Sequence, residues 1–285
     1  MNPSKQTFLF LSIIFLSGFI LRFLFLYPSN IIFGFDQARD FSLARSMFTT
    51  RDLKIIGPTA GNNPNLHHGV AFLYFLLPPL FLSGNPFYAV LWNCIFNTMA
   101  AVLLFFVAKS LFNSKKAAYI AAIIASVSFY YVQFSGWLSN PTVTLFTLPL
   151  FFLGLLKYKE GRKWGLPISA FFLGLTIQFE LFFVYLLPTG LLAWIILKPR
   201  FPSFNLILIS ILAFMAATST MILTEFKFGF AGVKSILFAG NFVGGQKQGL
   251  LELLVFFLKN RWETFYLNFF PQNSSIGTAF GMLMV

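Results

Sequence analysis

The sequence predicts an all-α membrane protein, a polytopic bundle of transmembrane helices. Hydrophobic residues make up 58% of the 285 residues, whereas charged residues make up only 10%. Soluble domains carry roughly 25% charged residues, so this chain lacks the polar surface of a water-soluble globule. Phenylalanine is frequent, with 42 residues. Its side chain suits lipid-facing helices because it buries a large area without a polar atom to satisfy.

The formal net charge is +12, which in a soluble protein would suggest a nucleic-acid partner. Here most basic residues fall in short loops between apolar stretches, where they determine the orientation of the chain in the membrane. We therefore expect the lipid bilayer, and no nucleic acid, as the partner. The single cysteine, Cys94, excludes an intrachain disulfide.

Seven apolar stretches are candidates for crossing the membrane, for which a helix needs about 20 residues. They are residues 7–27, 88–108, 117–134, 142–156, 164–180, 181–197 and 205–224. The stretch 69–83 is shorter and is interrupted by Pro78 and Pro79. We expect it to lie in the membrane interface or to insert halfway.

The distribution of charge predicts which loops face the inside. With the N-terminus inside and 69–83 not spanning, the inner loops hold ten basic residues and one acidic residue, Glu160. The outer loop 28–87 holds four basic and three acidic residues. Because inner loops carry the excess of Lys and Arg, this arrangement is favoured over one in which 69–83 spans. It places the N-terminus inside a multi-pass protein of the cell (plasma) membrane.

The chain is thereby divided into a seven-span module, residues 1–224, and an outer loop or tail, residues 225–285. Residues 276–285 are apolar and are expected to begin a further span. We therefore expect the chain to be the N-terminal portion of a longer protein.

The first outer loop holds the densest group of charged residues. Residues 36–49 have a helical composition, and Asp36 and Asp40 share one face of that helix because they lie four residues apart. Like charges at this spacing repel by a few tenths of a kcal/mol, so either something offsets the repulsion or one carboxylate is used in chemistry. The alternative is structural: Asp36 caps the helix N-terminus, and Asp40 pairs with Arg39 or Arg45.

Several motifs occur in a fixed order along the chain: FDQARD (35–40), RDLKIIGP (51–58), HHGVAFLYFLLPPLF (67–81), AKSLFNSKK (108–116) and FSGWLSNPT (134–142). Across about residues 8–235 this order resembles the GT-C membrane glycosyltransferases. Within that class, the order resembles the protein-mannosyltransferases and aminoarabinose transferases, which form glycosyltransferase family thirty-nine and its relatives. The resemblance implies interface helices in the first outer loop and a polyprenyl-phosphate sugar as donor. It also implies a lipid, glycan or protein acceptor on the outer face.

The resemblance also implies roles for individual residues. Asp36 matches the carboxylate that acts on the acceptor nucleophile, which fits the need for a base within hydrogen-bond reach of the attacking group. The departing lipid phosphate is acidic and needs cationic stabilisation rather than a strong acid. Arg39 matches an arginine of the transferase motif, and Lys227, at the outer end of the seventh span, is a second candidate. Both basic residues are alternatively anchors at the membrane interface.

His68 and Asn140 are expected to bind substrate. The family text at His68 is usually His-Gly-Pro, whereas this chain has Val70 in place of the proline. His68 would bind the phosphate or position the acceptor, or else is simply an interfacial histidine. At Asn140 the transferases often have an acid; the amide cannot act as a base, so sugar binding is expected, with a turn before Pro141 as the alternative.

Three ionisable residues lie close to the membrane. Glu180 and Glu225 are expected to line one outward cavity with Asp36, because an ionisable group at membrane depth is a functional candidate. Arg22, near the outer end of the first span, is expected to extend to the lipid headgroups. Adjacent histidines rarely form a zinc site without further ligands, so no metal site is predicted at His67–His68, and no cofactor is expected.

A transporter or flippase of lipid-linked substrates is the main alternative function. Transporters place ionisable residues near the middle of the bilayer and often contain a repeat. This sequence shows no repeat and collects its carboxylates at one face, so an enzyme is favoured. A non-catalytic fragment of a glycosyltransferase relative is the third interpretation.

Overall fold

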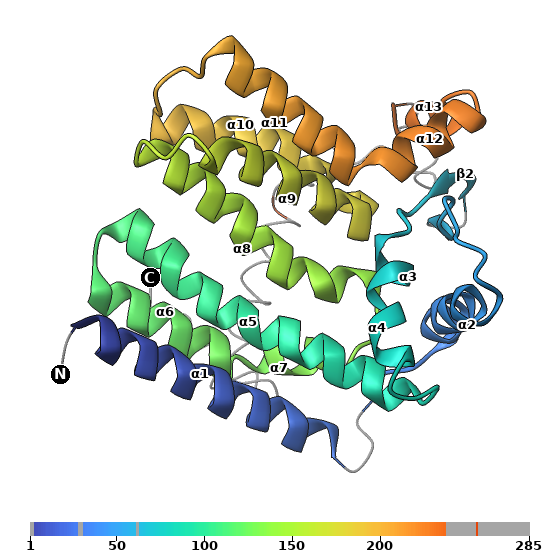
Figure 1. Cartoon of the computed structure of the whole chain (residues 1–285), viewed down its shortest axis with the longest axis horizontal. Coiled ribbons are helices and arrows are strands. Elements are labelled where there is room, and N and C mark those ends of the chain that lie inside the picture. The colour runs from blue at the N-terminus through green and yellow to red at the C-terminus, as the bar shows by residue number, and fades with distance from the viewer. Residues whose placement is uncertain (1–2, 28–30, 61–62, 238–254, 256–285) are drawn as a thin grey trace.

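The computed structural model describes residues 3–27, 31–60, 63–237 and 255. The chain forms a layered bundle in which the long helices run side by side (Figure 1). The helices are α1 (Pro3–Leu26), α2 (Phe35–Thr50), α3 (Ala71–Phe75), α4 (Leu77–Leu80), α5 (Pro86–Phe112), α6 (Lys115–Val127), α7 (Phe129–Ser135), α8 (Asn140–Lys159), α9 (Gly165–Phe179), the 3₁₀-helix η1 (Leu181–Tyr185), α10 (Leu186–Leu197), α11 (Phe204–Ala217), α12 (Ser219–Lys227) and α13 (Ala231–Leu237).

The described residues contain three to five candidate membrane spans. Three are continuous, in α1, α5 and α8, and two more arise if each of the bent pairs α6–α7 and α11–α12 is one span. The pairs bend by 52° and 69°, so the predicted spans 117–134 and 205–224 are each interrupted by a bend. Helix α9 and the η1–α10 segment are apolar but shorter. The protein is thus a multi-pass membrane protein with a mostly helical fold.

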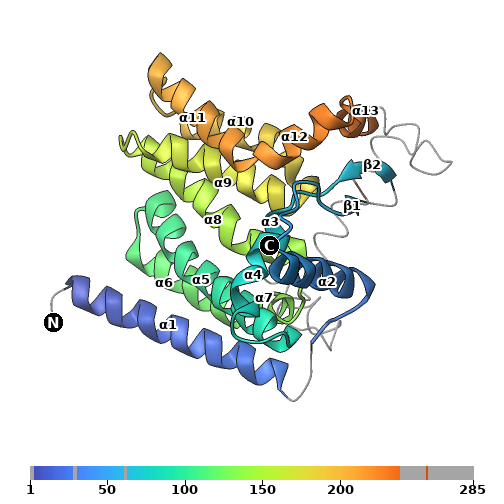
Figure 2. The ribbon, with the colours of Figure 1, turned by 45° about the vertical axis from the view of Figure 1, so that its right-hand side comes forward.

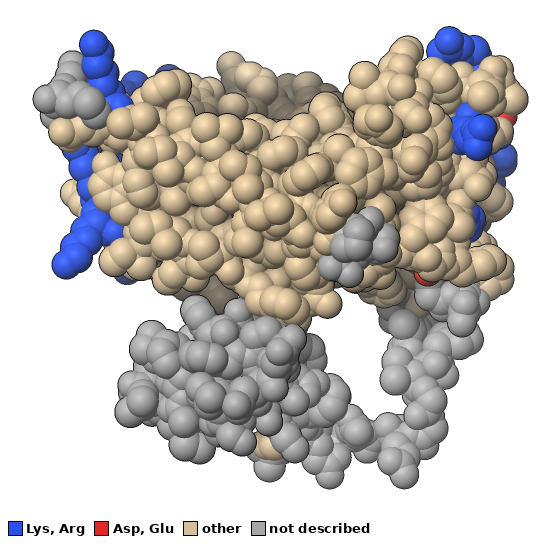
Figure 3. All heavy atoms as spheres, turned by 90° about the horizontal axis from the view of Figure 1, so that it is seen from below, with Lys and Arg blue, Asp and Glu red and all other residues tan. Residues whose placement is uncertain are grey.

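Charged side chains gather at two opposite ends of the bundle and leave a broad uncharged band between them (Figure 3). The α5–α6, α8–α9 and α10–α11 connections lie at the end near the N-terminus, and α2, α3 and α4 lie at the other end (Figures 1 and 2). We call the latter the cavity end. An uncharged band between polar ends is what a bilayer requires, because its hydrocarbon core solvates no charge.

The cavity end also carries a short β-hairpin that the sequence did not predict. Its strands β1 (Thr59–Ala60) and β2 (Asn63–His67) pair antiparallel, and α13 packs against β2. The segment 69–83 forms the two short helices α3 and α4, which contact α2, α9 and α5. Ten helical residues extend about 15 Å, half of the hydrocarbon thickness.

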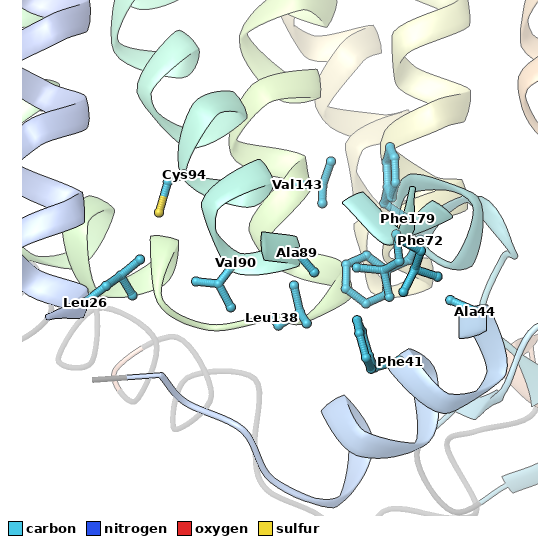
Figure 4. Close-up of a cluster of buried hydrophobic side chains, with 12 residues drawn as sticks. Leu26, Phe41, Ala44, Phe72, Ala89, Val90, Cys94, Leu138, Val143 and Phe179 are labelled. Atoms are coloured by element: carbon cyan, nitrogen blue, oxygen red, sulfur yellow. The ribbon is translucent and has the colours of Figure 1, made fainter. Parts of the chain in front are cut away.

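A cluster of buried apolar side chains joins the helices beneath the cavity end (Figure 4). Leu26 of α1, Phe41 of α2, Phe72 of α3, Leu138 and Phe179 of α9 all belong to it and are at most 6% exposed. Burial of such side chains stabilises by roughly 1.5–3 kcal/mol each. The cluster therefore fixes α2 and α3, which lie outside the long helices, onto the bundle.

Arg22 does not extend to the headgroups, which corrects the sequence-based expectation. It is fully buried, because its face of α1 is turned towards α5 and α6 rather than towards lipid. Its Nε donates to Asn97 Oδ1 at 2.7 Å, and its Nη1 donates to the carbonyl oxygens of Gly18 and Ser126, both at 3.0 Å. The Nε and Nη1 groups of the guanidinium thus find acceptors inside the bundle. The apolar stretch 276–285 lies outside the described residues.

Candidate functional site

A polar cavity of about 570 Å³ opens at the cavity end. It lies between the start of α2, β1, the segment before α3, the α7–α8 connection and the turn from α9 into η1. Its lining residues are Phe35, Asp36, Arg39, Thr59, His68, Trp137, Ser139, Asn140, Pro141, Glu180 and Phe182. Residues separated by more than 140 positions therefore meet around one space.

Arg39 stands between the two carboxylates of α2. Its Nη1 lies 3.0 Å from Asp36 Oδ1, and its Nε lies 2.8 Å from Asp40 Oδ1. The Asp36 side chain is 66% exposed, whereas that of Asp40 is 4% exposed. Asp36 thus faces the open cavity. Asp40 is buried and fixes the position of Arg39 through its hydrogen bond to Nε. Burial raises the pKa of Asp40, and the hydrogen bond from Arg39 opposes that rise.

The cap of α2 is formed by residues other than Asp36. Gly34 occupies the N-cap position, and its backbone N–H donates to Gln37 Oε1 at 2.8 Å. The proposal that Asp36 caps this helix was therefore wrong, because the helix begins one residue earlier than the pattern suggested. The alternative pairing of Asp40 with Arg39 is the one that occurs.

His68 and Glu180 face each other on the opposite side of the cavity. His68 Nδ1 lies 3.5 Å from Glu180 Oε1, and each side chain is 12% exposed. Burial, reinforced by the charge of Arg39, lowers the pKa of His68 to about 4, against the effect of Asp36. Burial raises the pKa of Glu180, while the Phe182 backbone N–H that it accepts opposes the rise. At neutral pH the imidazole is uncharged and offers one donor and one acceptor.

Two glycines hold His68 in this place. A Cβ added to Gly69 would lie 1.9 Å from Gln178 Oε1 and 2.2 Å from the Gln178 backbone oxygen. A Cβ added to Gly57 would lie 2.1 Å from the backbone oxygen of His68. Only hydrogen side chains permit these approaches, so the segment before α3 is pressed directly against the end of α9.

Asn140 is the first residue of α8, a 20-residue helix whose N-terminus faces the cavity. The N-terminal end of a helix carries partial positive charge and favours anions. Trp137, Ser139 and Pro141 line the cavity beside it. Sequence reasoning did not single these three out, although they flank Asn140 in the motif FSGWLSNPT. Thr59 and Phe182 were also missed, because no pattern indicated the hairpin or the 3₁₀ turn.

Glu225 and Lys227 are not part of this cavity. Glu225 lines a neighbouring apolar cavity of about 300 Å³, to which α12 and residues 66–69 contribute the largest groups of lining residues. Its Oε2 accepts the Val233 N–H at 3.1 Å. The expectation that Glu225 shares the cavity of Asp36 was therefore wrong: Glu225 lies on α12, beyond the 69° bend that follows α11, and lines the apolar cavity instead. Lys227 is exposed, and its Nζ lies 5.8 Å from the Phe228 ring centroid.

Fold and site together define a multi-pass helical membrane protein with a polar cavity at one end of its bundle. Residues 68–224, more than half of the chain, match the family described as dolichyl-phosphate-mannose-protein mannosyltransferase. The chain belongs to this family of membrane glycosyltransferases, which use lipid-linked sugars. No curated protein and no solved structure matches the chain. Helix α2, with Asp36 and Arg39, precedes the matched segment.

Proposed function

We propose that the protein transfers a sugar from a polyprenyl-phosphate donor to an acceptor on the outer face of the cell membrane. The observation that carries this proposal is the position of Asp36, an exposed carboxylate at the mouth of a polar cavity that also contains Arg39 and His68. Membership of a family that uses lipid-linked sugars supports it.

In the proposed reaction, an acceptor hydroxyl or amine attacks the anomeric carbon of the donor, and Asp36 takes the proton. The bond between that carbon and the phosphate oxygen breaks, and its electron pair leaves on the lipid phosphate. General-base assistance of this kind contributes typically about 10²–10⁴-fold in rate. The acceptor would be a lipid, a glycan or a protein.

Arg39 and Asn140 would receive the phosphate and the sugar. The Nε and Nη1 atoms of Arg39 contact the two aspartates, and its Nη2 carries two further N–H donors suited to a phosphate oxygen. Asn140 would hydrogen-bond sugar hydroxyls at the start of α8. Neutral His68, with Glu180 beside it, would orient the acceptor or the phosphate.

The proposed topology has seven spans, with the N-terminus inside and the cavity end outside. In it the α9 and η1–α10 segments each cross the membrane, and the α3–α4 segment lies at the outer interface. The ionisable residues of the cavity would then lie at one face of the membrane. This arrangement favours an enzyme over a transporter, whose ionisable residues lie near the bilayer centre.

The test is an Asp36→Asn variant of the full-length membrane protein, assayed for sugar transfer from its polyprenyl-phosphate donor. The substitution preserves the shape of the side chain and removes the base, so we expect transfer to fall by about 10²–10⁴-fold with unchanged expression. Asp52→Asn is the matched control, because Asp52 is an exposed aspartate paired with Lys54 outside the cavity. Near-full transfer by Asp36→Asn would overturn the proposed role.

A further inference from the structure

Residues 137–141 form one wall of the cavity, and a buried asparagine of α5 makes hydrogen bonds to this wall on the side away from the cavity. Asn93 is 1% exposed. Its Nδ2 lies 3.1 Å from the Ser135 carbonyl oxygen and 3.3 Å from that of Trp137, and it accepts at Oδ1 from Thr142 Oγ1 at 3.1 Å. One side chain therefore contacts the end of α7, the connection and the first turn of α8.

The same connection is joined to the segment that leads into α2. The Ile32 backbone N–H donates to the Gly136 carbonyl oxygen at 3.0 Å, and Ile32 forms an isolated parallel bridge with Trp137. Asp36 follows four residues later, in the first turn of α2. Residues 134–137 therefore contact Asn93 and also the strand-like segment at Ile32. Through these contacts Asn93 is linked both to the cavity wall formed by residues 137–141 and to the segment that leads to Asp36.

The other end of α7 is held in a related way. The break between α6 and α7 falls at Ser128. Just before it, the Ser126 carbonyl oxygen accepts from Arg22, which also donates to Asn97. Asn97 lies one turn after Asn93 on α5, so both asparagines lie on one face of that helix. Polar groups in a lipid environment must be satisfied within the protein. Asn93 does so directly for carbonyl oxygens at the end of α7, whereas Asn97 acts through Arg22, which binds the carbonyl oxygen of Ser126 at the end of α6.

We propose that Asn93 is a positioning residue for the cavity: it holds residues 134–137 so that Trp137, Ser139 and Asn140 face Asp36. The geometric part of this proposal is independent of the reaction. Only its consequence for catalysis rests on the proposed function. A leucine would fill the same volume without any hydrogen bond, so Asn93→Leu separates this role from simple packing.

The first test uses a single cysteine at the cavity wall, Ser139→Cys, in a Cys94→Ala background. The rate at which a small charged thiosulfonate reagent modifies this cysteine reports how well the connection is held. We expect Asn93→Leu to increase the rate by about tenfold or more, because it removes all three hydrogen bonds of the side chain and each ordinary hydrogen bond contributes about 0.5–1.5 kcal/mol. Thr98→Val is the matched control, because the hydroxyl of buried Thr98 donates within its own helix, to the Cys94 carbonyl oxygen.

The second test measures disulfide formation between Ile32→Cys and Trp137→Cys, whose backbones are paired in the structure. The cross-link should form rapidly in the parent and with Thr98→Val, and at least several-fold more slowly with Asn93→Leu. If Asn93→Leu does not yield a monodisperse protein, Asn93→Ser, which retains one donor, should give an intermediate result in both assays.

Unchanged modification and cross-linking rates in the folded Asn93 variants would overturn the proposal. So would equal increases with Thr98→Val, because the effect would then belong to α5 packing in general. Neither assay contains a sugar donor or an acceptor. A failure of the proposed glycosyl transfer would therefore be distinguishable from a failure of this positioning role.

Discussion

His68 Nδ1 lies 3.5 Å from Glu180 Oε1, in a place where burial keeps the imidazole neutral and disfavours the charged carboxylate. The two residues come from the segment before α3 and from the turn after α9. Their contact joins the beginning of the segment that matches the family, residues 68–224, to a later part of the same segment. Titration of His68 should accordingly be linked to the stability of the fold.

Acid should destabilise the protein through His68. Its pKa is about 4 in the folded state and 6.5 as the reference value, so the unfolded chain binds the proton more readily between these values. The stability that neutral His68 supports is then complete above about pH 6.5 and is lost as the pH falls towards 4. The difference corresponds to about 3 kcal/mol at most. Thermal unfolding of the purified protein between pH 7 and 4 measures it.

The His68→Gln variant separates this effect from the other titrating groups. It should lose less stability than the parent over the same pH range. Raised pKa values at Asp40 and Glu180 act in the opposite direction, but they remain in both proteins and largely cancel in the comparison. Parallel pH profiles for the two proteins would contradict the role assigned to His68.

Replacement of Arg39 by lysine should impair both stability and transfer. A lysine offers one point charge and cannot face Asp36 and Asp40 with separate nitrogens, so buried Asp40 would lose its partner. An unsatisfied buried acceptor costs about 1–3 kcal/mol, and more when charged. Chemical unfolding and sugar-transfer rates would measure the two effects. Arg45→Lys, an exposed change on the same helix, should alter neither.

A single methyl group at Gly69 should displace the histidine beside it. Gly69→Ala would place a Cβ 2.2 Å from the backbone oxygen of Gln178, and α9 cannot yield as a flexible side chain would. Misplacement of a substrate-binding group by about 1 Å costs roughly 10²-fold in rate, which transfer assays would detect. Gly84→Ala, where the nearest atom lies 3.8 Å away, should retain activity. Full activity of Gly69→Ala would show that the close approach is not required.

Cysteine labelling should establish the proposed seven-span topology. In a Cys94→Ala background, an impermeant maleimide added to intact cells should modify Asn65→Cys at the cavity end. Lys163→Cys and Arg200→Cys, in the connections at the opposite end, should react only after the membrane is permeabilised. Labelling of Arg200→Cys from outside, with Lys163→Cys protected, would mean that either α9 or the η1–α10 segment does not cross as proposed. Labelling of Lys163→Cys from outside would contradict the proposed crossings up to α8.

The sequence predicted which residues line the cavity better than it predicted how the chain folds around it. Asp36, Arg39, His68, Asn140 and Glu180 were chosen from charge, spacing and family motifs, and the fold brings all five around one space. Their meeting depends on contacts such as that of Gly69 with Gln178, which join distant segments and leave no local pattern. For the same reason the hairpin was missed.

The misplaced residues share a physical cause. Glu225 was expected beside Asp36 because it closes the seventh apolar stretch near the outer face, whereas the chain bends by 69° before Ser219. Arg22 was expected at the headgroups because hydropathy describes a residue's depth and not the face of the helix on which it lies. In both cases the deciding information is the direction of a helix or of a side chain, which composition does not contain.

The buried apolar cluster and the cavity lining have no residue in common, although they alternate along the chain. Leu138 belongs to the cluster while Trp137 and Ser139 line the cavity, and Phe179 packs inward while Glu180 faces the open space. Neighbouring positions thus have separate roles, one in the buried cluster and the other at the cavity surface. Substitutions in the lining could therefore change the preferred sugar or acceptor without loss of packing in the buried cluster that supports the lining.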